Sequence, residues 1–221
     1  MKVALLDVET TGDDPAEDVP VEFAAIFLSD DKVKETFSTL IHPGHRPISP
    51  VASSCHHLTA SSFTEDNSIA QPDISYWEHL LGDQDYLVAH NASFDRSFLP
   101  DQGIPWICTW KIARHLYPDA PKFSLQCLRY WLDLSVRTGS VPHRAMYDVK
   151  CLLALYKHFR KSKSPEEMAY MTQQPVLLSQ VTFGKYRGTP WNEVPRDYLK
   201  WITKNEFDED TTYTAHYYLT D

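Results

Sequence analysis

The feature that most constrains the fold is an apolar stretch at the start of the chain, Lys2–Val8, with two acidic residues at its far end. A short, near-continuous apolar run of this kind predicts a central strand buried on both faces. Side chains alternate along a strand, so Asp7 and Glu9 are expected on the same face. An acid in a buried strand is costly unless something compensates its charge, and a bound cation is one such partner. A solvated turn at the strand end is the alternative that these residues alone leave open.

The rest of the first 160 residues alternates between strand and helix patterns. Further strands are expected at 21–28, 36–41, 86–89 and 106–109. Helices are expected at 93–99, 109–117, 124–134 and 144–159. Three strands followed by strands alternating with helices predict an α/β fold with a mixed sheet flanked by helices.

These patterns divide the chain into a main domain and a small C-terminal module, joined by a linker. Residues 1–160 are predicted to form the main domain, 161–175 a polar linker and 176–221 a small C-terminal module. Within the module, Thr182–Gly188 predicts a strand, a tight turn and a return, with a helix over 195–205. Lys185, Tyr186 and Arg187 could hold a nucleic acid. The aromatic residues of the module could equally form its own core, and its acids outnumber its bases by seven to five.

Charge and cysteine content limit the classes of function. The net charge of −9 argues against a protein that coats nucleic acid with a broad basic surface, but suits a carboxylate pocket that holds divalent metals. The four cysteines stand far apart without metal-ligand spacing, which predicts reduced thiols, no zinc site and a cytoplasmic protein. The sequence predicts neither a signal peptide nor a membrane span.

Three more polar residues follow predicted elements at the same end of the sheet. Asp95 comes after the strand at 86–89, where α/β folds commonly carry ligand sites, although it could simply favour the start of a helix. His143 and Asp148 are five residues apart, which puts the histidine on a loop and the acid in the first helical turn. A histidine there could act as a base, or it could be an ordinary surface residue.

In combination, Asp7-x-Glu9, the His90-Asn-Ala-Ser-Phe-Asp95 segment and His143-x4-Asp148 resemble the three motifs of the DEDD exonucleases. The histidine marks the DEDDh (DnaQ-like) branch, because the tyrosine branch would carry a tyrosine at position 144, which is arginine here. The segments 90–100 and 182–188 are similar to the exodeoxyribonuclease X group within that branch. The resemblance implies a ribonuclease H-like fold.

The resemblance also implies a mechanism and a set of site residues. A DEDDh enzyme releases 5′-mononucleotides from a 3′ end with two Mg²⁺ ions, for which Mn²⁺ can substitute, and oxygen ligands suit both metals. Asp7 would bridge the metals, Glu9 and Asp148 would hold one, Asp95 would reach the other, and His143 would take the proton of the attacking water. The residues expected to bind the substrate are Thr10, Thr11, His56, Asn91 and Phe94, with Lys111, Arg114 and Arg129 as candidate phosphate contacts.

The expected partner is DNA with a free 3′ end, single-stranded or frayed. The motifs leave RNA open as the substrate, because the two chemistries differ only in contacts to the 2′-hydroxyl. A catalytically silent nucleic-acid-binding module is a further alternative, and a homodimer also stays open. A role in DNA repair is implied by the resemblance alone.

Overall fold

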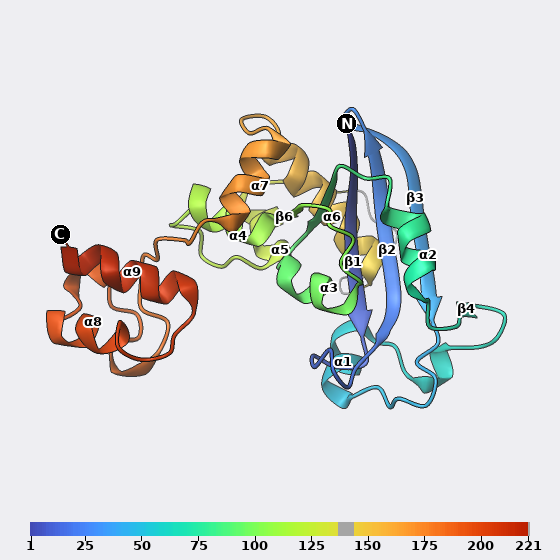
Figure 1. Cartoon of the computed structure of the whole chain (residues 1–221), viewed down its shortest axis with the longest axis horizontal. Coiled ribbons are helices and arrows are strands. Elements are labelled where there is room, and N and C mark those ends of the chain that lie inside the picture. The colour runs from blue at the N-terminus through green and yellow to red at the C-terminus, as the bar shows by residue number, and fades with distance from the viewer. Residues whose placement is uncertain (137–143, 221) are drawn as a thin grey trace.

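The computed structural model describes residues 1–136 and 144–220. Its centre is a six-stranded mixed sheet in the order β4-β3-β2-β1-β5-β6 (Figure 1). The strands are β1 (Lys2–Thr10), β2 (Pro20–Ser29), β3 (Lys32–Ile41), β4 (Ser68–Ile69), β5 (Tyr86–Ala89) and β6 (Trp106–Cys108). The first three form an antiparallel meander, and β5 and β6 continue the sheet parallel to β1. This arrangement confirms the predicted α/β fold with a mixed sheet.

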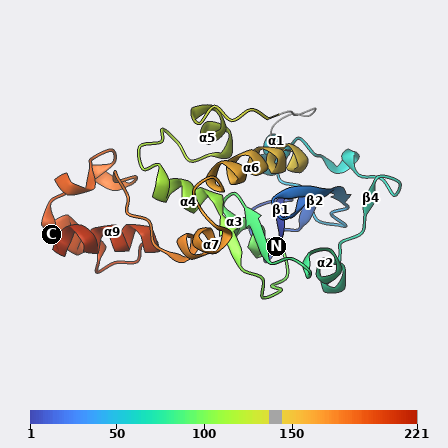
Figure 2. The same cartoon turned by 90° about the horizontal axis from the view of Figure 1, so that it is seen from above.

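Helices cover both faces of the sheet and connect its strands. They are α1 (Pro50–His56), α2 (Ile74–Leu81), α3 (Ala92–Phe98), α4 (Thr109–Leu116), α5 (Leu125–Trp131), α6 (Ala145–Phe159) and α7 (Pro165–Gln173). Figure 2 shows α6 and α2 on opposite sides of β1 and β2. Among the described residues, no helix has the length and apolar character to cross a membrane.

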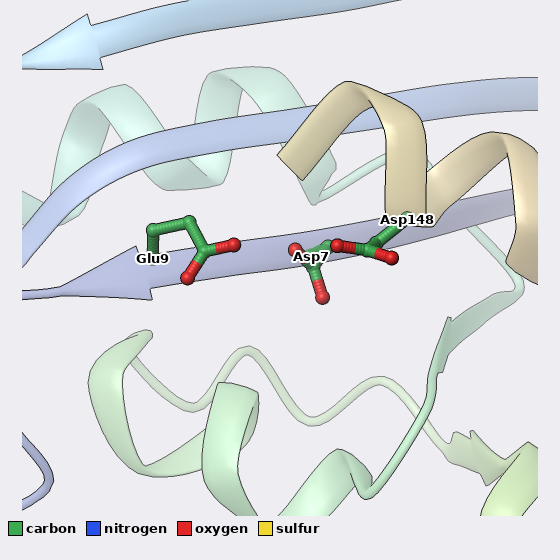
Figure 3. Close-up of side chains that lie close together, drawn as sticks. All are labelled: Asp7, Glu9 and Asp148. Atoms are coloured by element: carbon green, nitrogen blue, oxygen red, sulfur yellow. The ribbon is translucent and has the colours of Figure 1, made fainter. Parts of the chain in front are cut away.

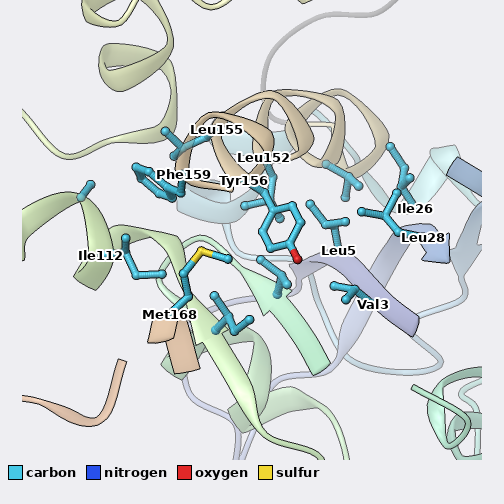
Figure 4. Packing of buried hydrophobic residues seen from close by; sticks show 14 of the residues in the cluster. Val3, Leu5, Ile26, Leu28, Ile112, Leu152, Leu155, Tyr156, Phe159 and Met168 are labelled. Atoms are coloured by element: carbon cyan, nitrogen blue, oxygen red, sulfur yellow. The ribbon is translucent and has the colours of Figure 1, made fainter. Parts of the chain in front are cut away.

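The alternation of side chains along β1 produces two separate hydrophobic cores. Val3 and Leu5 point to the side covered by α6, where Tyr156 and Leu152 of that helix pack on them (Figure 4). Leu6 and its even-numbered neighbours face the opposite core, which α2 and α3 close. Side chains at the odd-numbered positions after Leu5 are therefore expected to face α6 as well.

Helix α7 differs from the sequence-based expectation. The range 161–175 was predicted as a linker, but most of it is helical, and Met168 is fully buried in the core beneath α6. The hydroxyl of Thr172 in this helix accepts a hydrogen bond of 2.9 Å from the backbone N–H of Cys108 in β6. The linker prediction is therefore wrong for α7, which packs on the sheet as part of the first 173 residues.

The C-terminal residues form a small unit with its own core, beside α4 and α7 in both views (Figures 1 and 2). It contains α8 (Arg196–Ile202) and α9 (Glu209–Thr220), and Trp191 is fully buried at its centre. The strand, turn and return predicted over Thr182–Gly188 are found only in part. The segment holds a short 3-10 turn, Gly184–Tyr186, and the antiparallel pairing lies just outside it, where the N–H of Val181 donates to the carbonyl of Thr189 and the N–H of Trp191 to that of Ser179, around the bridge between Gln180 and Pro190.

Candidate active site

Two of the candidate carboxylates lie at the end of β1, on its α6 side. Asp7 and Glu9 follow Val3 and Leu5 on the same face of the strand, and both are half-buried (Figure 3). The strand continues past its parallel partner β5, whose pairing with β1 ends at Leu5. The two acids therefore stand beyond the β5 pairing, where side chains from helices can approach them.

A third carboxylate comes from the first turn of α6. Asp148 is buried, and its ligand oxygen lies within 4.8 Å of those of Asp7 and Glu9, which lie below it on β1 (Figure 3). Gln126 of α5 donates a hydrogen bond of 3.3 Å from Nε2 to Asp148 Oδ1. An oxygen-only group of this size matches the ligands that hard divalent cations prefer.

Asp95 approaches the same strand from the other side, on α3. Its side chain is 2% exposed, and its Oδ1 accepts a hydrogen bond of 3.2 Å from the backbone N–H of Val8. That N–H has no partner in β5, because the parallel pairing has already ended. Asp95 lies outside the group of three carboxylates but close enough to raise the pKa of Asp7 by charge repulsion.

Burial and mutual repulsion make these acids weak. Burial, followed by the charges of Asp95 and Glu9, raises the pKa of Asp7 well above its usual value. Burial and the charge of Asp148 raise the pKa of Glu9 to about 8, and burial raises that of Asp95 to about 7. A cation among the oxygens would remove the repulsion, so the donor set fits a divalent metal.

A fifth buried acid, missed in the sequence, fixes the start of α6. Glu22 of β2 stands opposite Glu9 and is 4% exposed. Arg144 binds it with two hydrogen bonds, of 3.0 Å from Nε and 2.9 Å from Nη2, and the N–H of Ala145 adds a third of 3.2 Å. The signal was present, since an acid within the apolar run at 21–28 requires a partner.

A pocket of about 620 Å³ opens beside Glu9. The end of β1 forms one wall, α1 forms another, and Phe94 of α3 closes a third. Its size and its place next to the carboxylates suit the last nucleotide of a strand. Of the residues predicted to bind substrate, Thr10, His56 and Phe94 line it.

The polar groups of these predicted substrate residues are largely engaged within the protein. The hydroxyl of Thr10 donates to the carbonyl of Gly12. His56 is 1% exposed; its Nδ1 accepts from the N–H of Leu58, so its Nε2–H donates to the carbonyl of Thr10 at 3.1 Å. His56 therefore shapes the pocket wall and has no hydrogen-bonding group left for a sugar.

Thr11 and Asn91 also differ from the expectation. Thr11 is fully buried, and its N–H and hydroxyl donate to Val19 and Asp18, so the prediction that Thr11 offers donors to a nucleotide is wrong. Asn91 is exposed in a left-handed conformation at the start of α3 and lines a neighbouring pocket instead. Phe94 packs on Phe98 with ring centres 5.0 Å apart, which fits core packing as well as stacking.

The candidate phosphate contacts are engaged elsewhere. Lys111 and Arg114 pair with Glu209 and Asp210 of the C-terminal unit, at 3.5 and 2.8 Å. Arg129 donates to the hydroxyl of Tyr147 at 2.6 Å. His143, predicted as the base, lies outside the described residues.

The comparisons with known proteins agree with this geometry. The model of the RNase T exonuclease family matches residues 4–156, and the chain belongs to this exonuclease family. The chain is similar to exodeoxyribonuclease 10 of Escherichia coli strain K12, with 38% identity over 208 residues, which cover 91% of this chain and 90% of the relative.

Other similar proteins match about three quarters of this chain. A PolC-type DNA polymerase III from Clostridium perfringens is 32% identical over 74% of this chain, but the match covers only 11% of that polymerase. The structure of exonuclease X in complex with 5′ overhanging duplex DNA matches with a TM-score of 0.65 and 36% identity, over 77% of this chain and 99% of that one. Exonuclease I of E. coli with a dT13 oligonucleotide shares the fold at a TM-score of 0.61 and 21% identity, over 76% of this chain and 43% of that one.

Proposed function

We propose that this chain is a metal-dependent exodeoxyribonuclease that removes 5′-mononucleotides from the 3′ end of DNA. The observation that carries the proposal is the group formed by Asp7, Glu9 and Asp148, whose oxygens lie within 4.8 Å of one another beside a nucleotide-sized pocket. The resemblance to exodeoxyribonuclease 10 over nearly the full length favours DNA over RNA. None of the four cysteines, all within the described residues, forms a disulfide, which suits the cytoplasm.

The residues divide the chemistry as follows. Asp7, Glu9 and Asp148 would hold divalent cations, with Asp95 assisting on the α3 side. Two such cations, Mg²⁺ by preference and Mn²⁺ as a substitute, stabilise negative charge on the attacking and leaving oxygens of a phosphodiester. The pocket under α1 receives the terminal nucleotide, Phe94 forms one of its walls, and His143 accepts the proton of the attacking water.

A gel assay tests the proposal with a 5′-labelled single-stranded DNA, its RNA counterpart, and Mg²⁺ or EDTA. We expect the DNA to shorten from its 3′ end in Mg²⁺, and both EDTA and Asp7→Asn to abolish the ladder. Asp119→Asn changes an exposed aspartate outside the carboxylate group and serves as the matched control, with unchanged activity. A ladder on RNA alone would contradict DNA as the substrate. No ladder on either nucleic acid would contradict the proposed exonuclease activity.

The proposed base has its own prediction. A general base contributes about 10²- to 10⁴-fold to a rate, so His143→Ala should lower turnover by that order. Metal affinity, measured by calorimetry, should stay nearly unchanged, because His143 is not among the oxygen ligands. Unchanged turnover at saturating Mg²⁺ would remove His143 from the mechanism.

A further inference from the structure

The C-terminal unit carries five aromatic side chains in one continuous series, here called the ring series. Successive ring centres are 4.7 to 5.4 Å apart. In order of contact, the members are Tyr186, Tyr198, Trp201, Phe207 and Phe183. The rings come from the 3-10 turn, from α8 and from the loop before α9, so the fold of the unit brings them together.

The ring series reaches the surface. Trp201 exposes 47% of its surface, whereas Trp191, at the centre of the same unit, is fully buried. Trp201 stacks on Tyr198 with an angle of 24° between the ring planes. A core of aliphatic residues around Trp191 is already present. A large aromatic side chain held half-exposed beside it is therefore available to a ligand.

Basic side chains accompany these rings. The Nζ of Lys185 lies 4.9 Å from the ring centre of Tyr186 and 5.5 Å from that of Tyr198. Arg187 and Lys204 are exposed close by in the sequence. In the part of the chain that the structure describes, none of these three cations forms an ion pair.

Two acids of the unit are engaged away from the ring series. Glu209 and Asp210 pair with Lys111 and Arg114 of α4, so they neutralise the contact with the exonuclease domain. Residues 183–208, which contain all five rings and helix α8, hold five Lys or Arg and four acids. The overall excess of acid in the unit therefore does not extend to this segment.

A glycine keeps the rings together. Gly184 has a φ of +60°, and a Cβ built on it would lie 2.7 Å from the hydroxyl oxygen of Tyr198. Any larger residue would push Tyr198 away from the turn that carries Lys185 and Tyr186. The position of Tyr198 between Tyr186 and Trp201 is thus set before any ligand arrives.

We propose that the ring series and Lys185 bind single-stranded DNA, as a second contact for the strand whose 3′ end lies in the active site. Aromatic rings stack on bases of any sequence, and neighbouring cations pair with the phosphates, so the combination suits an enzyme that must degrade every sequence. A protein partner would not require the unpaired cations beside the rings. This inference rests on the proposed exodeoxyribonuclease function.

The test uses the full-length chain with Trp201→Ala, and Tyr217→Ala as the matched control. Tyr217 is 41% exposed on α9 of the same unit but is not part of the ring series. Binding of a fluorescein-labelled dT30 is followed by anisotropy in EDTA, where no hydrolysis occurs. We expect Trp201→Ala to raise Kd about tenfold and Tyr217→Ala to leave it unchanged. Lys185→Glu, a surface change with little risk to folding, should weaken binding and reduce its salt dependence.

A second measurement separates this inference from the proposed function. Hydrolysis of the p-nitrophenyl ester of thymidine 5′-monophosphate requires only the active site, so Trp201→Ala should hydrolyse it at the wild-type rate. Normal ester hydrolysis together with wild-type binding of dT30 in both Trp201→Ala and Lys185→Glu would overturn the DNA contact alone. Absence of ester hydrolysis in the wild type would instead overturn the proposed function.

Discussion

At the scale of single residues, the site concentrates negative charge that the protein itself barely compensates. Asp7, Glu9, Asp95 and Asp148 come within reach of one another, and the pKa values of the first three are raised. Arg144, whose charge lowers the pKa of Glu9, is held by Glu22. The metal-free protein must therefore keep protons on some of these carboxylates near neutral pH.

These raised pKa values predict how stability depends on pH. Glu9 has a pKa of about 8 in the folded chain against 4.5 ordinarily, and Asp95 about 7 against 3.8. The folded state then binds more protons than the unfolded state between these values, so stability falls as pH rises through that interval. We expect the free energy of unfolding in EDTA, measured with urea, to decrease from about pH 5 to pH 8.

Two controls accompany that measurement. Saturating Mg²⁺ should restore stability at pH 8, because the cation takes the place of the protons. Glu9→Gln should flatten the decrease in EDTA, because it removes one of the titrating groups. A free energy that rises over this range in EDTA would contradict the assignment.

The pair of buried Glu22 and half-buried Arg144 predicts a marked effect from a small change. Glu22→Gln removes the charge that compensates Arg144 and disturbs the start of α6, which carries Asp148. Breaking a fully buried pair costs about 3–5 kcal/mol, so we expect a loss of about 2 kcal/mol, together with reduced turnover.

A second bidentate pair serves as its control. Arg160 binds Asp31 in the same two-bond manner, at 3.1 and 2.8 Å, but the Asp31 side chain is 48% exposed. Asp31→Asn should cost at most about 1 kcal/mol and leave turnover unchanged. The free energies of unfolding are measured with urea. Equal losses in both variants would contradict the expectation that the cost depends on burial of the carboxylate.

At the scale of elements, the pattern of the sequence predicted the sheet well because β1 and β2 bury whole faces. An apolar run with acids at its end has few alternatives, so the strand and the placement of Asp7 and Glu9 on one face followed from spacing alone. The partners of Asp148 and Glu22 could not follow, because Gln126 and Arg144 are brought in by tertiary packing. In the sequence, only the acidic Glu22 within the apolar run at 21–28 indicated that a compensating partner was needed.

Helix α7 was missed for a different reason. Its polar composition suggested a linker, although Ser164, Pro165 and Glu167 form a capping box with proline in the first turn, which is a signal for a helix start. In the C-terminal unit, a strand, a turn and a return were expected over Thr182–Gly188, but this segment forms a 3-10 turn and the short antiparallel pairing lies at 179–181 and 189–191. The division into domains stays a prediction.

Helix α7 leads to a truncation test. A chain that ends at residue 175 keeps Met168 in the core and Thr172 on β6, so it should fold and hydrolyse the nucleotide ester. A chain that ends at residue 162 should lose this packing, and burial of a side chain such as Met168 is worth about 2–5 kcal/mol. Circular dichroism reports whether each truncated chain folds, and urea unfolding measures its stability. Equal stability of the two chains would mean that α7 is dispensable for folding.

At the scale of the whole molecule, the C-terminal unit is attached to α4 through charged residues. Asp210 is 6% exposed and accepts hydrogen bonds of 2.8 Å from both Arg114 and the N–H of Val176. The similarity to exodeoxyribonuclease 10 covers 91% of the chain, which is too much for the alignment to stop before this unit. The alignment therefore extends into this unit.

This attachment predicts that one carboxylate controls the position of the unit. Asp210→Asn should weaken the docking and leave Arg114 buried without a counter-charge, at a cost of about 3 kcal/mol. Limited proteolysis near residue 175 should become faster. Glu209→Gln, whose pair with Lys111 is 3.5 Å long and whose side chain is 66% exposed, is the control and should cleave at the wild-type rate.

The alternation of side chains along β1 also bears on how such a chain can evolve. Asp7 and Glu9 share a face with Val3 and Leu5, so the same register that buries the core presents both carboxylates to α6. A deletion of one residue within the strand would turn both acids toward α2 and carry Val8 to the α6 side at the same moment. Lineages can therefore lengthen or shorten the loops around this strand, whereas a length change of one residue inside it disrupts the core and the carboxylate group together.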